Sequence, residues 1–385
     1  MKFSTVESEY LIALLKSAIK KEALPPVPDG IDWNKFVELS KKQQVYSIIA
    51  VILDSLPLPD EQAREIKLYN QNELLRIISM KTEQELIESE LEKSNIKFML
   101  LKGSLLRNYY PQQKMRQMSD VDILYDGKKK AELFEIMHSM DYSVLSCSEN
   151  SDDFTKKPFY TFEFHRDLFF KGHDFYFDFS YVWSRAEQSA ENGCKYVMKT
   201  EDLYLHSIAH MYKHYVLGGF GIRFLADIYL MLKSEAEKLD MNYINSKLIS
   251  FNLVDFEKLI RETSLALFDG CELSDEQIDF LNKSLEFGIY GNSNEGIKIY
   301  FDEYVKKNGG RGTILGFYMS KLFPSAEFMK RSFPVLEKRP YLMFAYYIYR
   351  LIQKLVFKRK NSLANYKILK EYNKKGTEVK NLGSK

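Results

Sequence analysis

Two neighbouring stretches of the sequence decide the fold: Leu100-Leu101-Lys102-Gly103-Ser104 and Ser119-Asp120-Val121-Asp122-Ile123-Leu124. The first ends the apolar run 96–101 at a Gly-Ser turn, which predicts a buried strand followed by a short helix. The second predicts a strand from which Asp120 and Asp122 project on the same face, because side chains alternate along a strand. Two carboxylates this close repel each other unless a cation lies between them, and oxygen ligands favour Mg²⁺ or Mn²⁺.

A polar hairpin further along the chain offers a third carboxylate. Residues 159–170 and 174–183 alternate between apolar and polar side chains, and 171–173 separates them, which predicts two paired strands. The predicted apolar face holds Phe162, Phe164, Leu168, Phe175, Phe177 and Phe179, and the polar face holds Glu163, His165, Asp167, Tyr176, Asp178 and Ser180. We select Asp178 as the third acid because residues that face the core flank it on both sides.

The turn at Gly103 and Ser104 suits phosphate. In front of a helix, its backbone N–H groups and the Ser104 hydroxyl are available to phosphate oxygens. An isolated Asp-x-Asp is structural at least as often as catalytic, and a Gly-Ser turn is usually only a turn. A strand, a Gly-Ser turn, a helix, an Asp-x-Asp strand and a later acid in this order are more specific, and together they favour a metal and phosphate site.

The same residues resemble a known enzyme superfamily. The order Leu-Lys102-Gly, Tyr110-Pro and Arg116-x-x-Ser-Asp-x-Asp resembles the nucleotidyltransferases typified by DNA polymerase β, and more closely a bacterial branch of uncharacterised nucleotidyltransferases. A later run resembles the helical part of that branch: Asp202, His206, His210, His214, Arg223 and Asp227. The resemblance covers approximately residues 35–290.

The resemblance implies a metal-dependent transfer of a nucleoside monophosphate from an NTP to a hydroxyl, with release of pyrophosphate. Asp120 and Asp122 would bind both metal ions, Mg²⁺ or Mn²⁺. Asp178 would help to bind one of the ions and would orient or deprotonate the attacking hydroxyl. The acceptor is expected to be a small molecule or a protein, because the net charge of +2 counts against a long nucleic acid.

Four residues are expected to hold the nucleotide. Gly103 and Ser104 would contact the β- and γ-phosphates, and Lys102 would neutralise phosphate charge. Arg116 is a further phosphate ligand in this interpretation, although an arginine just before a strand can equally pair with a nearby acid. Two alternatives are a non-catalytic nucleotide-binding regulatory module on the same fold, and a scaffold protein in which the two aspartates are structural.

Composition bounds the rest of the chain. Its 385 residues suggest two or three packed units, and 45% hydrophobic with 28% charged residues is ordinary for a globular protein. No apolar run is long enough to span a bilayer, and the early acid Glu7 argues against an export signal. Three scattered cysteines, Cys147, Cys194 and Cys271, argue against disulfides and a cysteine zinc site, so a cytoplasmic protein is expected.

We expect an α+β fold with a small mixed sheet of four or five strands between helical regions. The expected regions are an N-terminal helical region 1–92, a nucleotidyltransferase α/β domain 93–200, a C-terminal helical domain 201–360 and a flexible tail 361–385. Residues 146–158 are predicted to form a polar loop. Residues 61–93 are predicted to form one long helix with a single apolar stripe made of Leu68, Leu74, Leu75, Ile78, Leu86, Ile87 and Leu91.

Three further features have a structural and a functional interpretation. His206, His210 and His214 fall on one helix face, where a metal site is geometrically feasible but an interface or cleft-facing role is favoured. Arg223 and Asp227 are four residues apart and are predicted to pair on a helix surface. Residues 341–360 predict a basic amphipathic helix for a membrane surface or RNA, or, as we favour, a terminal helix docked through its aromatic side.

Overall fold

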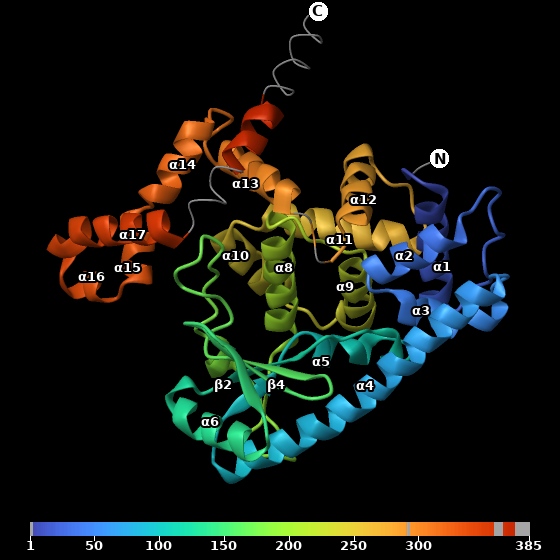
Figure 1. The fold of residues 1–385 in the computed structure, drawn as a ribbon, viewed down its shortest axis with the longest axis horizontal. Coiled ribbons are helices and arrows are strands. Elements are labelled where there is room, and N and C mark those ends of the chain that lie inside the picture. Colours follow the sequence, from blue (N-terminus) through green and yellow to red (C-terminus); the bar gives the residue numbers. More distant parts are fainter. Residues whose placement is uncertain (1–2, 290, 292, 358–364, 374–385) are drawn as a thin grey trace, which may run out of the picture. The chain divides into compact units, whose positions relative to one another are not determined.

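The structure is a computed structural model that describes residues 3–289, 291, 293–357 and 365–373 (Figure 1). The helices are α1 Val6–Lys20, α2 Trp33–Lys42, α3 Tyr46–Val51, α4 Asp60–Lys93, α5 Gly103–Leu106, α6 Lys130–Ser139, α7 Val182–Arg185, α8 Thr200–Val216, α9 Arg223–Glu235, α10 Met241–Phe251, α11 Val254–Asp269, α12 Asp275–Phe287, α13 Ser293–Lys307, α14 Ile314–Leu322, α15 Ala326–Ser332, α16 Val335–Lys338 and α17 Met343–Phe357. The strands are β1 Phe98–Leu100, β2 Val121–Tyr125, β3 Ser143–Cys147, β4 Ser151–Lys156, β5 Tyr160–His165, β6 Glu187–Gln188 and β7 Tyr196–Val197. Searching the described helices finds none that is long and apolar enough to cross a membrane.

A mixed five-stranded sheet in the order β1-β2-β5-β4-β3 confirms the expected α+β fold. The strand β2 pairs antiparallel with β1 and parallel with β5, in a register that sets Val121 opposite Phe162 and Asp122 opposite Glu163. A separate two-stranded ribbon joins β6 to β7. The parallel pairing of β2 with β5 matters most for the site, because it fixes which side chains of the two strands are neighbours.

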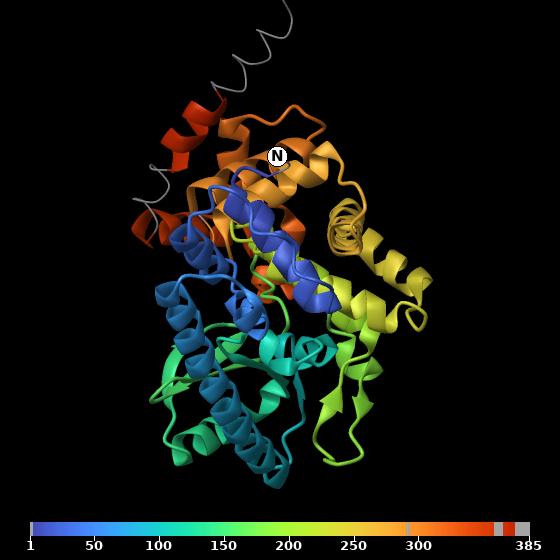
Figure 2. The same ribbon diagram turned by 90° about the vertical axis from the view of Figure 1, so that its right-hand side faces the viewer.

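One face of the sheet packs against α4 and α6, which run beside it (Figures 1 and 2). The core on this face includes Ile87 and Leu91 of α4, Leu133 and Met137 of α6, and Val121, Ile123, Phe162 and Phe164 of the two central strands. Asp122 and Glu163 alternate with these core residues, so they project from the opposite face of the sheet.

The predicted hairpin at 159–183 is wrong. Only Tyr160–His165 forms a strand there, and its antiparallel partner is β4, within a segment that was predicted to be a polar loop. The strand β4 escaped prediction because one of its buried positions is Asp152, which accepts hydrogen bonds from Lys130 and Tyr125 inside the fold. A buried, partnered acid removes the apolar alternation by which a strand is predicted.

The alternating phenylalanines after β5 mark an extended segment that is not part of the sheet. Phe177 and Phe179 are buried, and their rings lie 5.5 and 5.1 Å from the ring of Phe251 in α10. An extended chain that packs against a helix buries every second side chain just as a strand does. The periodicity therefore predicted burial correctly and ladder pairing incorrectly.

The long helix α4 is confirmed, but five of the seven residues of its predicted apolar stripe are exposed. Ile87 and Leu91 are fully buried, whereas Leu68, Leu75 and Ile78 are 58%, 63% and 57% exposed. In the first half of the helix a polar residue, Glu73, takes an inward position, where it accepts a hydrogen bond from the Met118 N–H. Because Glu73 replaces an apolar residue on the buried side, hydrophobicity alone pointed to the wrong face.

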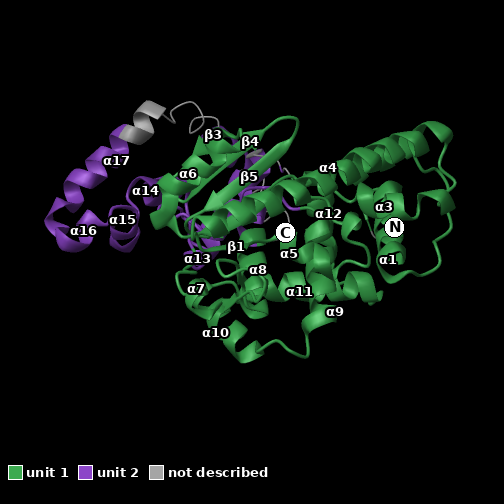
Figure 3. Cartoon of the chain, turned by 90° about the horizontal axis from the view of Figure 1, so that it is seen from below, with its two compact units in different colours: residues 1–168, 177–211, 221–289 green, residues 169–176, 212–220, 290–385 purple. Residues whose placement is uncertain are grey.

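The chain divides into two compact units (Figure 3). Unit 1 comprises residues 1–168, 177–211 and 221–289, and unit 2 comprises residues 169–176, 212–220 and 290–385. Unit 1 therefore contains the whole sheet together with the N-terminal helices and α9 to α12. The regions expected from the sequence divide the chain differently, and they remain predictions.

Unit 2 has its own small cores. Phe301, Phe317 and Leu369 form one, and Phe328, Met329 and Leu336 form another, against which residues of α17 pack. Leu369 lies in a helical stretch, 365–373, within the tail that was expected to be flexible, while 361–364 and 374–385 lie outside the described residues. The helix α17 only partly docks through its aromatic residues: Tyr346 and Tyr347 face the core, but Phe344 is 75% exposed.

Candidate functional site

The parallel pairing of β2 with β5 brings two acids and a histidine together. Asp122 lies opposite Glu163, and His165 follows two residues later on the same face of β5. One ligand atom from each of Asp122, Glu163 and His165 lies within 4.8 Å of the other two. These three side chains can therefore share one metal ion.

Asp120 extends this group into what we call the acid cluster: Asp120, Asp122 and Glu163. Asp120 lies one residue before β2 and is partly buried. Burial, together with the negative charges of Asp122 and Glu163, raises the pKa of Asp120 to about 6. The raised pKa reflects the cost of gathering three carboxylates in one place, a cost that a bound cation removes.

Two donors hold Asp122, the most buried member of the acid cluster. Lys102 Nζ lies 2.7 Å from Asp122 Oδ1, and His165 Nε2 lies 2.8 Å from the same oxygen. Burial alone would raise the pKa of Asp122, but the Lys102 charge and the hydrogen bond from His165 lower it well below its usual range. Burial alone would likewise lower the pKa values of Lys102 and His165, and the Asp122 carboxylate raises both. Asp122 is thus an ionised carboxylate whose counter-ion is a lysine.

The Gly-Ser turn lies directly beside the acid cluster. The Leu101 N–H donates to the Asp122 carbonyl oxygen at 3.0 Å, which ties the end of β1 to β2. Lys102 follows with φ +42° and ψ −112°, a strained conformation that residues with a side chain rarely adopt. Ser104, at the start of α5, has a buried hydroxyl that makes no hydrogen bond to any residue in the described part of the chain. A buried hydroxyl without a partner costs free energy in the free protein, so it is well suited to a ligand oxygen.

Arg116 lies against the same turn and is held there by a distant aspartate. Its Nε and Nη2 atoms donate to the two carboxylate oxygens of Asp227 in α9, at 2.7 and 2.9 Å. Burial alone would lower the pKa of Arg116, but Asp227 raises it, so the guanidinium stays charged. A Cβ atom at Gly103 would come within 2.7 Å of Arg116 Nη1, so glycine is needed at the turn to leave room for it. Of the two roles expected for Arg116, pairing with an acid is the one seen.

The predicted surface pair between Arg223 and Asp227 is wrong, because both residues are buried. Arg223 Nη1 donates to the Gln117 carbonyl oxygen at 2.9 Å, while Asp227 accepts from Arg116 and, at 2.8 Å, from the Tyr110 hydroxyl. Sequence spacing placed the pair on one helix but carried no information on what covers that helix. Both residues instead join α9 to the segment that precedes the Asp-x-Asp strand.

Asp178 does not join the acid cluster. It lies exposed in the extended segment after β5, and its carboxylate accepts a hydrogen bond from the Ser180 N–H. Among the described residues, neither Asp178 nor Asp120 belongs to the group of ligand atoms within 4.8 Å of one another, and Asp120 is assigned to the acid cluster by its electrostatic interaction with Asp122 and Glu163. Glu163 occupies the position that was expected for Asp178, because β5, and not a second hairpin strand, pairs next to β2.

The three histidines of α8 are also absent from the groups of metal-ligand atoms found in the described chain. His206 is buried, and its ring lies 5.7 Å from that of Phe179 and 6.2 Å from that of His210. His210 in turn lies 6.4 Å from the ring of Phe224. For His206 and His210, these aromatic contacts fit the interface role that was favoured over metal binding.

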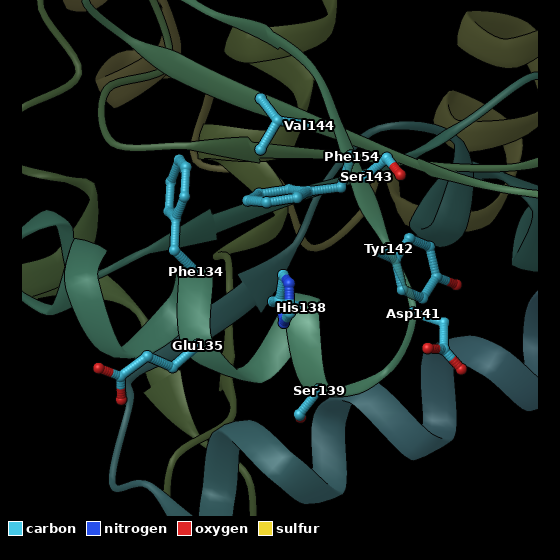
Figure 4. A pocket seen from close by; sticks show the side chains of 9 residues that line it. All are labelled: Phe134, Glu135, His138, Ser139, Asp141, Tyr142, Ser143, Val144 and Phe154. Carbon is cyan, nitrogen blue, oxygen red and sulfur yellow. The ribbon is translucent and has the colours of Figure 1, made fainter.

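A hollow of about 830 Å³ lies between α6 and β3, away from the residues described above (Figure 4). Phe134 and His138 of α6 and Val144 and Phe154 of the strands point into it. None of the acid cluster, the Gly-Ser turn or Arg116 lines it. The hollow is therefore not the candidate site.

A family model described as uncharacterised nucleotidyltransferase matches residues 29–269. The chain belongs to this family. The region that matches the nucleotidyltransferase family contains the acid cluster, Lys102, the Gly-Ser turn, Arg116 and Asp227, and the resemblance seen in the sequence is confirmed.

Two solved structures align with part of this nucleotidyltransferase. One is a crystal structure of ANT(2″)-Ia in complex with adenylyl-2″-tobramycin, and the other is a solution structure of the antibiotic-resistance factor ANT(2″)-Ia. Each is 12% identical to this chain; the alignments cover 44% and 43% of it and 95% and 87% of the other chains, with TM-scores of 0.34 and 0.33. A search of curated proteins found no match.

The side chains of this nucleotidyltransferase fit a divalent cation. Asp122 and Glu163 supply carboxylate oxygens, the donor type that Mg²⁺ and Mn²⁺ prefer, and His165 adds a nitrogen within 4.8 Å. Burial, followed by the negative charges of Asp122 and Glu163, raises the pKa of Asp120, and the charge of Lys102 only partly opposes this. Asp122, Glu163 and His165 are thus the described residues that would hold a metal, and Asp120 adds negative charge to them.

Glu163 is the functional candidate that the sequence reasoning missed. The sequence did place Glu163 and His165 on a polar face opposite the core phenylalanines, and the structure confirms this for both. Choosing Glu163 over Asp178 required the strand order, which depends on contacts across 41 residues of chain between Asp122 and Glu163. The usable signal was the Glu-x-His pattern itself, two titratable residues that alternate with the core residues Phe162 and Phe164.

Proposed function

We propose that this nucleotidyltransferase transfers a nucleoside monophosphate from an NTP to a hydroxyl group of a small-molecule or protein acceptor, and that Mg²⁺ or Mn²⁺ supports the reaction. In the proposed step, the acceptor oxygen forms a bond to the α-phosphorus and the bond from the α-phosphorus to the β-bridging oxygen breaks. The acceptor hydroxyl gives its proton to the Glu163 carboxylate, and pyrophosphate leaves. Divalent metal would neutralise the phosphate charge and activate the attacking oxygen.

One observation carries this proposal: the acid cluster lies beside a strained turn that presents an unpartnered, buried serine hydroxyl. Carboxylates alone indicate a cation site, and a Gly-Ser turn alone indicates little. The Leu101 N–H donates to the backbone carbonyl of Asp122, and Lys102, next to Gly103, donates to the Asp122 carboxylate. These two bonds support a site that takes a metal and a phosphate together.

The residues divide into three roles in this proposal. Asp120 and Asp122 bind metal, and Gly103 with Ser104 receives phosphate oxygens through the backbone and the hydroxyl. Glu163 takes the part first expected of Asp178, as a metal ligand that faces the acceptor. Its side chain is 32% exposed, against 9% for Asp122, so Glu163 is the acid that an incoming hydroxyl can reach.

Arg116 acts from behind the turn. Asp227 uses two of its nitrogens, and the third, Nη1, lies next to Gly103. A guanidinium held in this way offers a fixed positive charge to the phosphates. It has no side-chain entropy left to lose when the nucleotide binds, whereas a free arginine would lose it.

Label transfer tests the proposal. The full-length protein is incubated with each α-³²P-labelled NTP, Mg²⁺ or Mn²⁺, and a cell extract separated into small-molecule and protein fractions. We expect labelled product in one fraction and loss of that product in Asp122→Asn. Saturable NTP binding without any label transfer would support the regulatory module instead.

A control variant distinguishes loss of the site from loss of the fold. Lys195→Met breaks another ion pair of the sheet region, between Lys195 Nζ and Glu88 Oε2 at 2.7 Å, far along the chain from the acid cluster. This variant is expected to retain label transfer. Equal loss in Lys195→Met and Asp122→Asn would show that the assay reports folding and not the site.

A further inference from the structure

We propose that Lys102 couples metal binding to nucleotide binding: its ammonium is the cation of Asp122 in the free protein, and it moves to the triphosphate when the nucleotide arrives. This inference rests on the proposed function and adds to it an order of events. Metal alone binds weakly, nucleotide alone binds weakly, and the metal–nucleotide complex binds well.

The contacts of Asp122 show why a free metal ion is disfavoured. Lys102 Nζ and His165 Nε2 both approach Asp122 Oδ1, at 2.7 and 2.8 Å, so this oxygen already has two hydrogen-bond donors. The Lys102 side chain is 19% exposed and that of Asp122 is 9% exposed. An ion that binds between Asp122 and Glu163 must displace a donor or share a poorly solvated space with an ammonium ion.

Charge explains the opposite effect of the nucleotide. The acid cluster and Asp227 provide four carboxylates, and Lys102, Arg116 and Arg223 provide three cations within the same buried region. A divalent ion without its phosphates turns this nearly balanced set positive. A triphosphate brings negative charge next to the turn, which gives the displaced ammonium a new partner.

The backbone places Lys102 between the two partners. Lys102 directly precedes Gly103 and Ser104, so its ammonium is attached to the same turn that would receive the phosphates. Its backbone at φ +42° directs the side chain back toward Asp122 although the chain is leaving the strand. A lysine has four rotatable side-chain bonds, so exchange between carboxylate and phosphate needs side-chain rotation only.

Opposite changes in two affinities test the coupling. The affinity for Mn²⁺ alone is measured by electron paramagnetic resonance of the free ion. The affinity for Mn²⁺ complexed to the α,β-methylene analogues of the four NTPs is measured by calorimetry, so no turnover is needed. In Lys102→Met, Mn²⁺ alone is expected to bind about tenfold more tightly, and the Mn²⁺–nucleotide complex about tenfold more weakly, than in the wild type.

Control variants keep the result interpretable. Lys195→Met, which breaks a lysine–carboxylate pair of similar length elsewhere in unit 1, is expected to leave both affinities unchanged. Lys102→Gln removes the charge but keeps a donor for Asp122, and it is expected to change both affinities in the same directions as Lys102→Met. It serves as the test variant if Lys102→Met does not fold.

The outcomes separate this inference from the proposed function. If wild-type protein binds the Mn²⁺–nucleotide complex but both affinities fall or rise together in the Lys102 variants, the coupling is refuted and the proposed function stands. If wild-type protein binds none of the four complexes, the proposed function fails and the coupling fails with it. Opposite changes, absent in Lys195→Met, confirm the coupling.

Discussion

Removal of the Asp227 carboxylate should destabilise unit 1 more than any other single truncation near the site. Asp227 is buried and accepts from Arg116 Nε, Arg116 Nη2 and the Tyr110 hydroxyl at 2.7, 2.9 and 2.8 Å. Asp227→Ala leaves the Arg116 guanidinium buried without its counter-ion, which costs about 3–5 kcal/mol of unfolding free energy. For a unit of this size, the midpoint of thermal unfolding should fall by about 6–20 °C.

Tryptophan fluorescence reports this transition selectively, because the two tryptophans of the chain, Trp33 and Trp183, both lie in unit 1. Thermal and urea unfolding of Asp227→Ala, Arg116→Met and the double variant then form a cycle. The double variant should lose less stability than the sum of the single variants, since neither charge is then left alone. Tyr110→Phe, which removes one bond to the carboxylate, should cost about 2 kcal/mol.

Two results would refute this reasoning. A loss below about 1 kcal/mol in Asp227→Ala would mean that water or another acid already satisfies Arg116. Additive losses in the double variant would mean that Arg116 and Asp227 stabilise the fold independently, contrary to the two bonds between them.

Three further outcomes are expected. Glu163→Gln should lower label transfer by about 10²–10⁴-fold whereas Asp178→Asn should not, and the reverse result would restore the hairpin acid to the site. Gly103→Ala should lower the free energy of unfolding by about 1–3 kcal/mol and weaken nucleotide binding, because the new methyl group meets Arg116 Nη1. Unchanged stability would show that the guanidinium has room to move. The folded-state pKa of Asp120, about 6, lies above its ordinary value of 3.8, so ionisation of Asp120 destabilises the metal-free fold as pH rises through this interval. Asp120→Asn should therefore be more stable than the wild type at pH 8, by at most about 3 kcal/mol, and equal to it at pH 3; equal stability at both pH values would contradict the crowding of carboxylates.

Local patterns were sufficient for the central strand and for the turn. The strand predicted at the Asp-x-Asp pattern forms as β2, Val121–Tyr125, because apolar residues alternate there with acids and a turn follows. The Gly-Ser turn likewise begins a helix, as predicted, since its signal lies within a few residues. Such features depend on neighbours in the chain, and the sequence displays those directly.

Features that depend on distant partners could not be predicted in this way. Glu163 becomes a site residue only because β5 pairs with β2. Asp152 made the strand β4 unrecognisable in the sequence, because the partners that allow its burial, Lys130 and Arg166, are brought to it by the fold. Asp227 was predicted to lie on a helix surface, whereas in the structure it accepts a hydrogen bond from Arg116. In each case a polar residue is buried with a partner, and the hydrophobic pattern of a single segment carries no record of that partner.

The link between Arg116 and Asp227 has a consequence for biosynthesis. The two residues are 111 positions apart, so a ribosome finishes the sheet and the Gly-Ser turn well before it delivers α9. Until then, the guanidinium behind the turn has no counter-ion and nothing fixes its direction. A nascent chain should thus bind nucleotide poorly until α9, a helix made well after the Gly-Ser turn, has been synthesised.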